Sequence, residues 1–208
     1  MRRLVHSLRL WPALLILAGC AINPGVRTTS GPDASLVYGY FDMADSPRTL
    51  WRVFLTQDKR VGIVYRPAGM NTYADGLFFM ENVPPKQYVI PYFSAGARTY
   101  DLASGSEHIF DVAPGSMKFV GAFVYVRHDD QDESGDSFTL QPTTQPTEAE
   151  ILRLLIDRVE DALWRKRIAE RLEIVDRQLT QADPSARVNL APGNTAAATA
   201  EDARIQAQ

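Results

Sequence analysis

The residues best suited to chemistry lie in one acidic stretch, 129–136, which reads DDQDESGD. Its oxygen-bearing side chains follow the spacing of the first half of a calcium-binding loop: Asp130, Asp132, Ser134 and Asp136. Hard cations need several oxygen ligands at close range, and a tight acidic loop can supply them. Gln141 stands where such a loop carries its bidentate glutamate. Calcium is therefore a secondary hypothesis, and the main interpretation is a solvated hairpin tip whose like charges discourage edge pairing.

Two histidines fall within or at the end of predicted strands, and only one of them lies beside aspartates. His128 directly precedes Asp129 and Asp130, and a histidine–aspartate pair can act as a general base. The other, His108, has no such neighbour. The chain contains none of the GxSxG, SxxK, HExxH, GxGxxG or Walker sequences that mark common catalytic sites. The sequence thus predicts no catalytic residue and no cofactor, with a hydrolase built around His128 as the minor alternative.

Composition narrows the class of protein. The 208 residues are 45% hydrophobic and 23% charged, as in ordinary globular proteins, and the length suits one domain with extensions. The 22 basic and 25 acidic residues argue against a nucleic-acid binder, which usually has a basic excess. The single cysteine excludes a disulfide framework and any CxxC site.

The first twenty residues have the features of an export signal. Three arginines precede an apolar run, 10–18, that is too short to span a bilayer. The run ends in Leu17-Ala18-Gly19-Cys20, which resembles the lipobox of bacterial lipoproteins. The resemblance implies that a signal peptide, residues 1–19, is removed. It also implies that Cys20 receives a diacylglycerol and that the new amino terminus is acylated, for example with palmitate.

The residues after the cysteine predict a location. Ala21 stands where lipoproteins retained in the inner membrane of Gram-negative bacteria tend to carry aspartate. The resemblance therefore implies the outer membrane, with the protein expected to face the periplasm. More than one acyl chain makes such attachment stable. Residues 20–33, rich in Pro, Gly, Ser and Thr after the lipidated cysteine, are expected to be a flexible tether.

Residues 34–140 show a β pattern, with short apolar runs separated by turn signals at intervals typical of a sandwich or barrel. Two runs are expected to place alternate side chains on one face: Trp51, Val53 and Leu55, and then Tyr88, Ile90 and Tyr92. The run 119–126 is apolar on both faces and is expected to be covered on both sides. One cover would be an opposing sheet and the other a helix.

A helix is expected over 147–180, which contains neither Gly nor Pro and begins with the capping-box pair Thr147 and Glu150. Its apolar residues form two stripes, Leu152, Leu155, Val159, Ala162 and Leu163, and then Ile168, Leu172, Val175 and Leu179. The second stripe begins about 160° around the helix from the first. A break near 160–166 is therefore expected. The second stripe would pack within the molecule or bind a partner, and the tail 183–208 is expected to be disordered.

Residues 75–90, DGLFFMENVPPKQYVI, resemble a strand–turn–strand unit of carboxypeptidase-regulatory-like and transthyretin-like β-sandwich modules. The matching residues are Asp75, Gly76, Phe78, Asn82, Val83, Pro84, Pro85 and Tyr88. Lys86 and Gln87 stand where that family usually has glycine after the prolines. The resemblance implies a fold and no activity.

These patterns together predict a mainly β, α+β fold. It would be an Ig-like or transthyretin-like antiparallel β-sandwich with a C-terminal helix or kinked helix pair packed on one sheet. The expected function is that of a non-catalytic outer-membrane lipoprotein acting as an envelope interaction or adaptor module. The alternative is a periplasmic module that binds a small ligand or glycan in a groove lined by tyrosines: Tyr38, Tyr40, Tyr65, Tyr88, Tyr92 and Tyr100. Aromatic residues favour strands, so core packing is the simpler interpretation of most of them.

Overall fold

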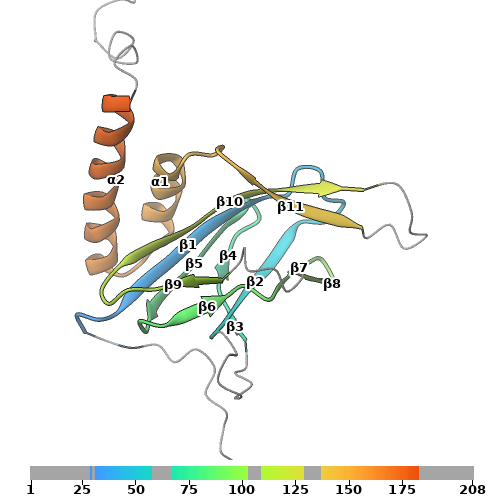
Figure 1. Ribbon diagram of the computed structural model, residues 1–208, viewed down its shortest axis with the longest axis horizontal. Coiled ribbons are helices and arrows are strands. Elements are labelled where there is room, and N and C mark those ends of the chain that lie inside the picture. The colour runs from blue at the N-terminus through green and yellow to red at the C-terminus, as the bar shows by residue number, and fades with distance from the viewer. Residues whose placement is uncertain (1–28, 30, 58–66, 103–108, 129–136, 183–208) are drawn as a thin grey trace, which may run out of the picture. The chain divides into compact units, whose positions relative to one another are not determined.

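A computed structural model describes residues 29, 31–57, 67–102, 109–128 and 137–182 (Figure 1). The first strands are β1 (Ser35–Asp42), β2 (Leu50–Gln57), β3 (Ala68–Gly69), β4 (Asn71–Thr72), β5 (Leu77–Val83) and β6 (Gln87–Val89). They are followed by β7 (Tyr92–Ala95), β8 (Arg98–Asp101), β9 (Ile109–Asp111), β10 (Met117–Arg127) and β11 (Phe138–Thr143). The helices α1 (Glu148–Arg158) and α2 (Ala162–Ala182) come last. Within these described ranges, no helix is long and apolar enough to cross a membrane.

The strands form two sheets. One has the order β11-β10-β1-β5-β4, and the other has the order β8-β7-β2-β6-β9, with β3 also paired to β2. Antiparallel registers place Tyr125 opposite Leu140, Val53 opposite Phe93, and Tyr88 opposite Phe110. Two sheets followed by a helix pair confirm the predicted α+β, β-sandwich class.

The chain divides into two compact units. Unit 1 comprises residues 1–38, 47–74 and 78–120, and unit 2 comprises 39–46, 75–77 and 121–208. The strands β1, β5 and β10 contribute residues to both units. The second sheet, from β8 to β9, belongs wholly to unit 1, whereas both helices belong to unit 2.

The core of unit 1 is aliphatic and aromatic. The ring of Phe93 stacks on that of Tyr100, with centroids 5.0 Å apart, and Tyr38 stacks on Phe119 at 5.4 Å. Among the residues of this unit that are almost fully buried are Leu36, Val37, Tyr38, Val53, Leu55, Phe78, Phe79, Tyr88 and Phe93. Consecutive buried residues on β1 and β5 show that both faces of these strands are covered, and β1, β2 and β5 together supply most of this core.

Two details of the strands differ from the expected pattern. The run expected to carry Tyr88, Ile90 and Tyr92 on one face is divided into β6 and β7 at Ile90 and Pro91. Proline has no amide hydrogen to donate to a ladder, which accounts for the interruption. Strand β10 is partly covered on both faces, since Ala122 and Tyr125 are buried and its other apolar side chains are half-buried.

The start of α1 follows the predicted capping box. The Thr147 amide donates to Glu150 Oε2 at 2.7 Å, and the Glu150 amide donates to Thr147 Oγ1 at 3.3 Å. The hydrogen bond from the Thr147 backbone, together with that from its side chain, holds the pKa of Glu150 below its ordinary value. The side chains of Thr147 and Glu150 therefore accept hydrogen bonds from backbone amides that have no partner within the helix.

The expected helix break lies between Arg158 and Ala162, overlapping the predicted range 160–166. The second helix has its own cap, because Asp161 Oδ1 accepts hydrogen bonds from the amides of Leu163, at 2.7 Å, and Trp164, at 3.1 Å. This cap explains why a new helix begins here.

Candidate functional site

Several of the predicted site residues lie outside the described residues. They include the lipidation candidate Cys20 and the calcium candidates Asp130, Asp132, Ser134 and Asp136. Gln141, which replaces the expected glutamate, is exposed on β11 opposite Val124. In the part of the chain that the structure describes, no group of three or more His, Cys, Asp or Glu residues is placed to hold a metal ion.

His128 lies just after β10 and is exposed. Its Nε2 is 3.2 Å from Thr139 Oγ1, and its backbone amide donates to the Ser137 carbonyl at 2.9 Å. Asp129 and the other histidine, His108, lie outside the described residues. The described partner of the imidazole is therefore a hydroxyl group on the neighbouring strand.

Three of the six tyrosines considered for a ligand groove are buried: Tyr38, Tyr88 and Tyr100. The hydroxyl of Tyr88 donates to the Pro84 carbonyl at 2.8 Å, and Tyr100 accepts from Arg48 Nη1 at the same distance. Burial raises the pKa of Tyr88 to about 12. These side chains pack in the core and do not line a groove.

The remaining tyrosines are divided. Tyr40 is half-buried, and its pKa is raised above its ordinary value by burial first and then by the negative charges of Asp42 and Asp75. Tyr92 is also half-buried and lies against Phe54, with ring centroids 4.5 Å apart. Tyr65 lies outside the described residues. The tyrosines as a set therefore do not converge on one site.

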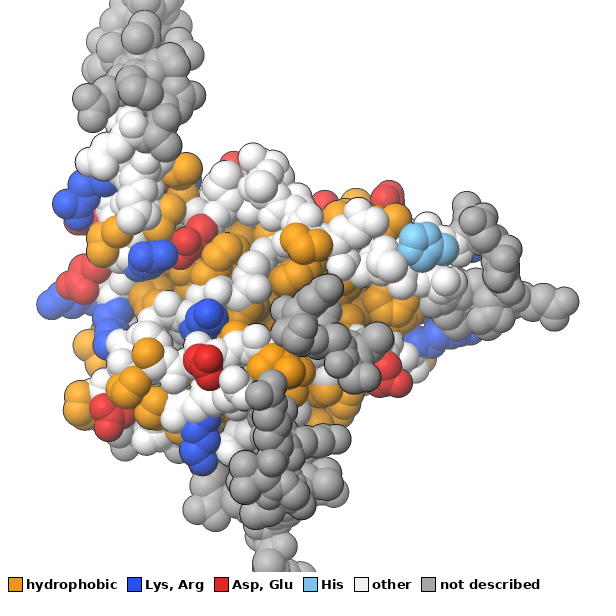
Figure 2. Space-filling view, viewed as in Figure 1, with side chains coloured by type: hydrophobic (Ala, Val, Ile, Leu, Met, Phe, Trp, Pro, Cys, Tyr) orange, Lys and Arg blue, Asp and Glu red, His pale blue; other side chains and the backbone are white. Residues whose placement is uncertain are grey.

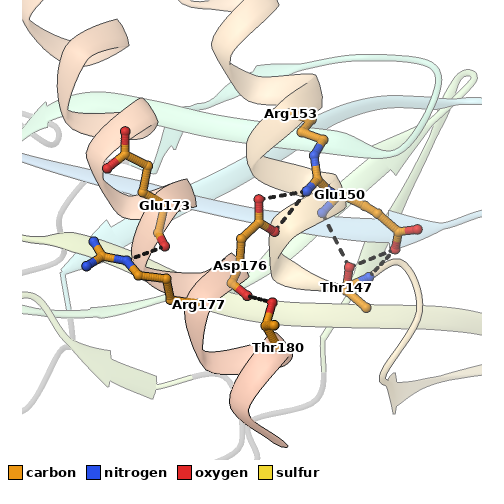
Figure 3. A network of polar contacts seen from close by, with 7 residues as sticks. All are labelled: Thr147, Glu150, Arg153, Glu173, Asp176, Arg177 and Thr180. Atoms are coloured by element: carbon orange, nitrogen blue, oxygen red, sulfur yellow. Dashed lines mark hydrogen bonds and ion pairs between the residues drawn. The ribbon is translucent and has the colours of Figure 1, made fainter. Parts of the chain in front are cut away.

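The helix pair is held together by apolar and ionic contacts. The two helices lie side by side and run in opposite directions (Figure 1). Arg153 Nη2 donates to both carboxylate oxygens of Asp176, at 2.8 and 2.9 Å (Figure 3). Arg171 forms a two-pronged contact with Glu148, at 3.0 and 3.2 Å. The two-nitrogen contact of Arg171 with Glu148 fixes the geometry of that pair and so restricts sliding between the helices.

The second apolar stripe does not form an exposed partner face. Ile168 and Val175 are buried and Leu172 is half-buried, whereas Leu179 is 47% exposed. The stripe becomes exposed at Leu179 because α2, with 21 residues, is longer than α1, with 11. At 1.5 Å per residue, α2 is about 15 Å longer than α1. Most of the second stripe therefore packs within the molecule, which is the first of the two outcomes expected for it, and only Leu179 is left as an exposed partner-binding candidate.

Exposed apolar side chains lie elsewhere on the helices. Leu163 is 61% exposed and Ile174 is 42% exposed, and the helical repeat puts them on one side of α2, about three turns apart. In Figure 2, side chains over the helix pair alternate between apolar, basic and acidic types. Leu163 and Ile174 are named the α2 outer positions below. This pair is a candidate contact surface that the stripe analysis missed.

One exposed aromatic residue was also missed. Alternation along β2 predicts that Trp51 shares a face with Val53 and Leu55, and only the latter two are buried. The register shifts between Leu50 and Arg52, which leaves Trp51 as an extra residue in a β-bulge. No sequence signal marked this shift.

Comparisons with known proteins give no family. No family model matches the chain, and no curated protein matches it. It is similar to part of a leucine-rich repeat protein from Bacteroides thetaiotaomicron, with 14% identity and a TM-score of 0.28. That match covers 44% of this chain and 12% of the other. It is also similar to a DUF3823 family protein from Parabacteroides merdae, with 13% identity and a TM-score of 0.28. This second match covers 49% of the chain and 52% of the other, so the chain spans about half or less of either protein. Likenesses this distant carry no argument about function.

Proposed function

We propose that this protein is a non-catalytic lipoprotein of the outer membrane that presents its helix pair to another envelope protein. The observation that carries the proposal is the exposure of the α2 outer positions, Leu163 and Ile174, on a helix that ionic pairs hold in place. Protein interfaces combine a few apolar anchors with a polar rim, and a rigid helix loses little conformational entropy when it binds.

The anchor is the other half of the proposal. The Leu17-Ala18-Gly19-Cys20 sequence supports removal of residues 1–19 and acylation of Cys20. Residues 20–33 would then tether the rest of the protein near the periplasmic face of the outer membrane. The tethered parts are the β-sandwich domain, 34–140, and the helical segment, 147–180. Residues 1–28 and the tail 183–208 lie outside the described residues. Two or more acyl chains would make the attachment stable.

The anchor is tested by the mass of the mature amino-terminal peptide and by incorporation of labelled palmitate. We expect the peptide to begin at an acylated Cys20 and the protein to sediment with outer membranes. Cys20→Ser should abolish labelling and release the protein from that fraction. An unmodified Cys20, or sedimentation with inner membranes, contradicts this part of the proposal.

The partner surface is tested by photocrosslinking in intact cells. A photoreactive residue is placed at the two α2 outer positions, Leu163 and Ile174, and at Glu170 between them. We expect both outer positions to capture the same envelope protein in high yield. Leu163→Asp should abolish the capture made from position 174, with no loss of folded protein because Leu163 is exposed.

A matched control separates this surface from a general loss of binding. Trp51→Ala changes an equally exposed apolar residue in unit 1 and should leave capture from position 174 unchanged. Capture of only abundant neighbours, unaffected by Leu163→Asp, would contradict the adaptor role.

A further inference from the structure

Trp51 is 64% exposed, which is more than any other large apolar side chain in the described part of the chain. It is the extra residue of the bulge in β2, since Leu50 pairs with Ala95 and Arg52 pairs with Ser94. Exposing an indole costs free energy that burial would recover. Bulges commonly redirect a side chain near a functional site, so the exposed Trp51 ring is a candidate contact for a ligand.

A cation lies beside the indole. The guanidinium carbon of Arg52 is 6.0 Å from the centre of the Trp51 ring. Gly69, which pairs with Phe54 from β3, leaves room for the arginine, because a β-carbon at position 69 would lie 2.6 Å from Arg52 Cδ. Arg52 is exposed, and it forms no ion pair with any carboxylate of the described residues. The charge is therefore available to an anionic ligand.

The same face continues into aromatic and hydroxyl groups. Strand alternation places Phe54 on the side of Arg52, and Phe54 lies against Tyr92 with ring centroids 4.5 Å apart. The antiparallel register also aligns Arg52 with Ser94 and then with Thr99 on β8. Thr99 is exposed. This surface, named the Trp51 face, consists of Trp51, Arg52, Phe54, Tyr92, Thr99 and Asp101, all in unit 1. Asp101 is exposed and stands opposite Tyr92 on β8.

We propose that the Trp51 face binds an acidic polysaccharide. The apolar face of a sugar ring would stack on the Trp51 indole, and the ring carboxylate would pair with the Arg52 guanidinium. Arginine binds carboxylates strongly because its planar donors match the two oxygens. The hydroxyl groups of Thr99 and Tyr92 would donate to or accept from the sugar hydroxyls.

The charge of Arg52 favours an acidic sugar over a neutral one at the Trp51 end of the face, and Asp101 lies two strands away on β8. A neutral sugar would use the indole and leave the arginine without a counter-charge. Aromatic and hydroxyl side chains follow one another across β2, β7 and β8, which suits an extended chain of sugar units. The inference is independent of the proposed adaptor role, because it uses neither the helix pair nor Cys20.

The test uses the full chain, purified in detergent, with tetragalacturonate as the acidic probe and maltotetraose as the neutral one. Isothermal titration calorimetry should show saturable binding of tetragalacturonate and at least tenfold weaker binding of maltotetraose. Trp51→Ala should weaken acidic binding at least tenfold, and Trp51→Phe should retain part of it. Arg52→Gln should remove the preference for the acidic probe.

Two further variants control the interpretation. Leu154→Ala removes an exposed apolar side chain from unit 2 and should leave binding unchanged. Gly69→Ala should weaken acidic binding by displacing Arg52 while leaving Trp51 in place. Circular dichroism checks that every variant is folded.

The proposal is overturned by any of three results. The first is an absence of saturable tetragalacturonate binding at millimolar concentration. The second is equal binding by the wild type and folded Trp51→Ala. The third is an acidic preference that Arg52→Gln does not reduce.

Discussion

Tyr88 offers the sharpest test of the packing, because one hydroxyl group makes two separable contributions to stability. Its side chain is fully buried, and its hydroxyl donates to the Pro84 carbonyl at 2.8 Å. Tyr88→Phe keeps the ring and removes only this donor. Leaving a partly buried carbonyl without its donor costs about 1–2 kcal/mol, so the variant should be less stable by that amount at pH 8.

The second contribution depends on pH. Burial raises the pKa of Tyr88 from 10.0 to about 12 in the folded protein. Above pH 10 the unfolded chain therefore loses its phenol proton first, and the wild type is progressively destabilised up to about pH 12. At 1.36 kcal/mol per pH unit, this loss reaches about 1.4 kcal/mol at pH 11. Tyr88→Phe has no phenol here and escapes the loss, while the other ionisable groups affect both proteins alike.

The two contributions oppose each other, so the stability difference between wild type and Tyr88→Phe should shrink to near zero by about pH 11. Urea unfolding followed by far-ultraviolet circular dichroism at pH 8, 10 and 11 measures it. Tyr92→Phe is the matched control, because that hydroxyl forms no hydrogen bond with the described residues. A Tyr88→Phe difference that is absent at pH 8, or that is the same at pH 8 and pH 11, refutes the reasoning.

Two glycines and a helix cap give further tests. Gly76→Ala should cost about 3 kcal/mol in urea unfolding, because φ is +99° and a β-carbon would overlap the Phe41 carbonyl. Gly31→Ala has a similar φ of +103° in open space and should cost only about 1 kcal/mol, so equal losses would contradict the steric argument. Thr147→Ala should lower stability by about 1 kcal/mol through loss of the cap, and an unchanged melting curve would exclude that role. Because the folded pKa of Glu150 is lowered, its contribution is present above pH 4.5 and is lost as pH falls through that lowered pKa. The Thr147→Ala difference should therefore diminish in acid.

Local signals in the sequence predicted local structure well. The capping box needs only Thr147 and Glu150, three residues apart, and its hydrogen bonds formed as expected. The change of phase between the two apolar stripes predicted a break, and the structure has two helices. The capping box lies within one turn, where neighbouring residues decide the conformation, and the phase change follows from the helical repeat alone.

The first stripe shows where a local pattern stops being informative. Leu152, Leu155 and Val159 are buried as expected, whereas Leu163, assigned to the same stripe, is 61% exposed. A single helical repeat was extended through residues that belong to a second helix with its own axis. The position of Leu163 depends on how the chain turns after Arg158, and periodicity carries no information about that turn.

Trp51 was missed for a related reason. A period of two assigns it to the buried face with Val53 and Leu55, and the bulge shifts it out of that phase. The shift is set by the pairing of β2 with β7, whose residues lie some forty positions later in the chain. A pattern read along one strand cannot detect an irregularity in its pairing.

The place of β1 in its sheet has a consequence for how the protein is made. A ribosome releases β1 early, yet the strand lies between β10 and β5. The Ser35 hydroxyl donates to the Ala113 carbonyl, 78 residues further along the chain, and the Leu36 amide donates to the Ser116 carbonyl. Until those residues emerge from the ribosome, the apolar strand β1 cannot pair with β10. This delay slows folding and exposes the nascent chain to aggregation. During synthesis β1 is therefore the segment that a holding chaperone would protect until residues 113–116 have emerged.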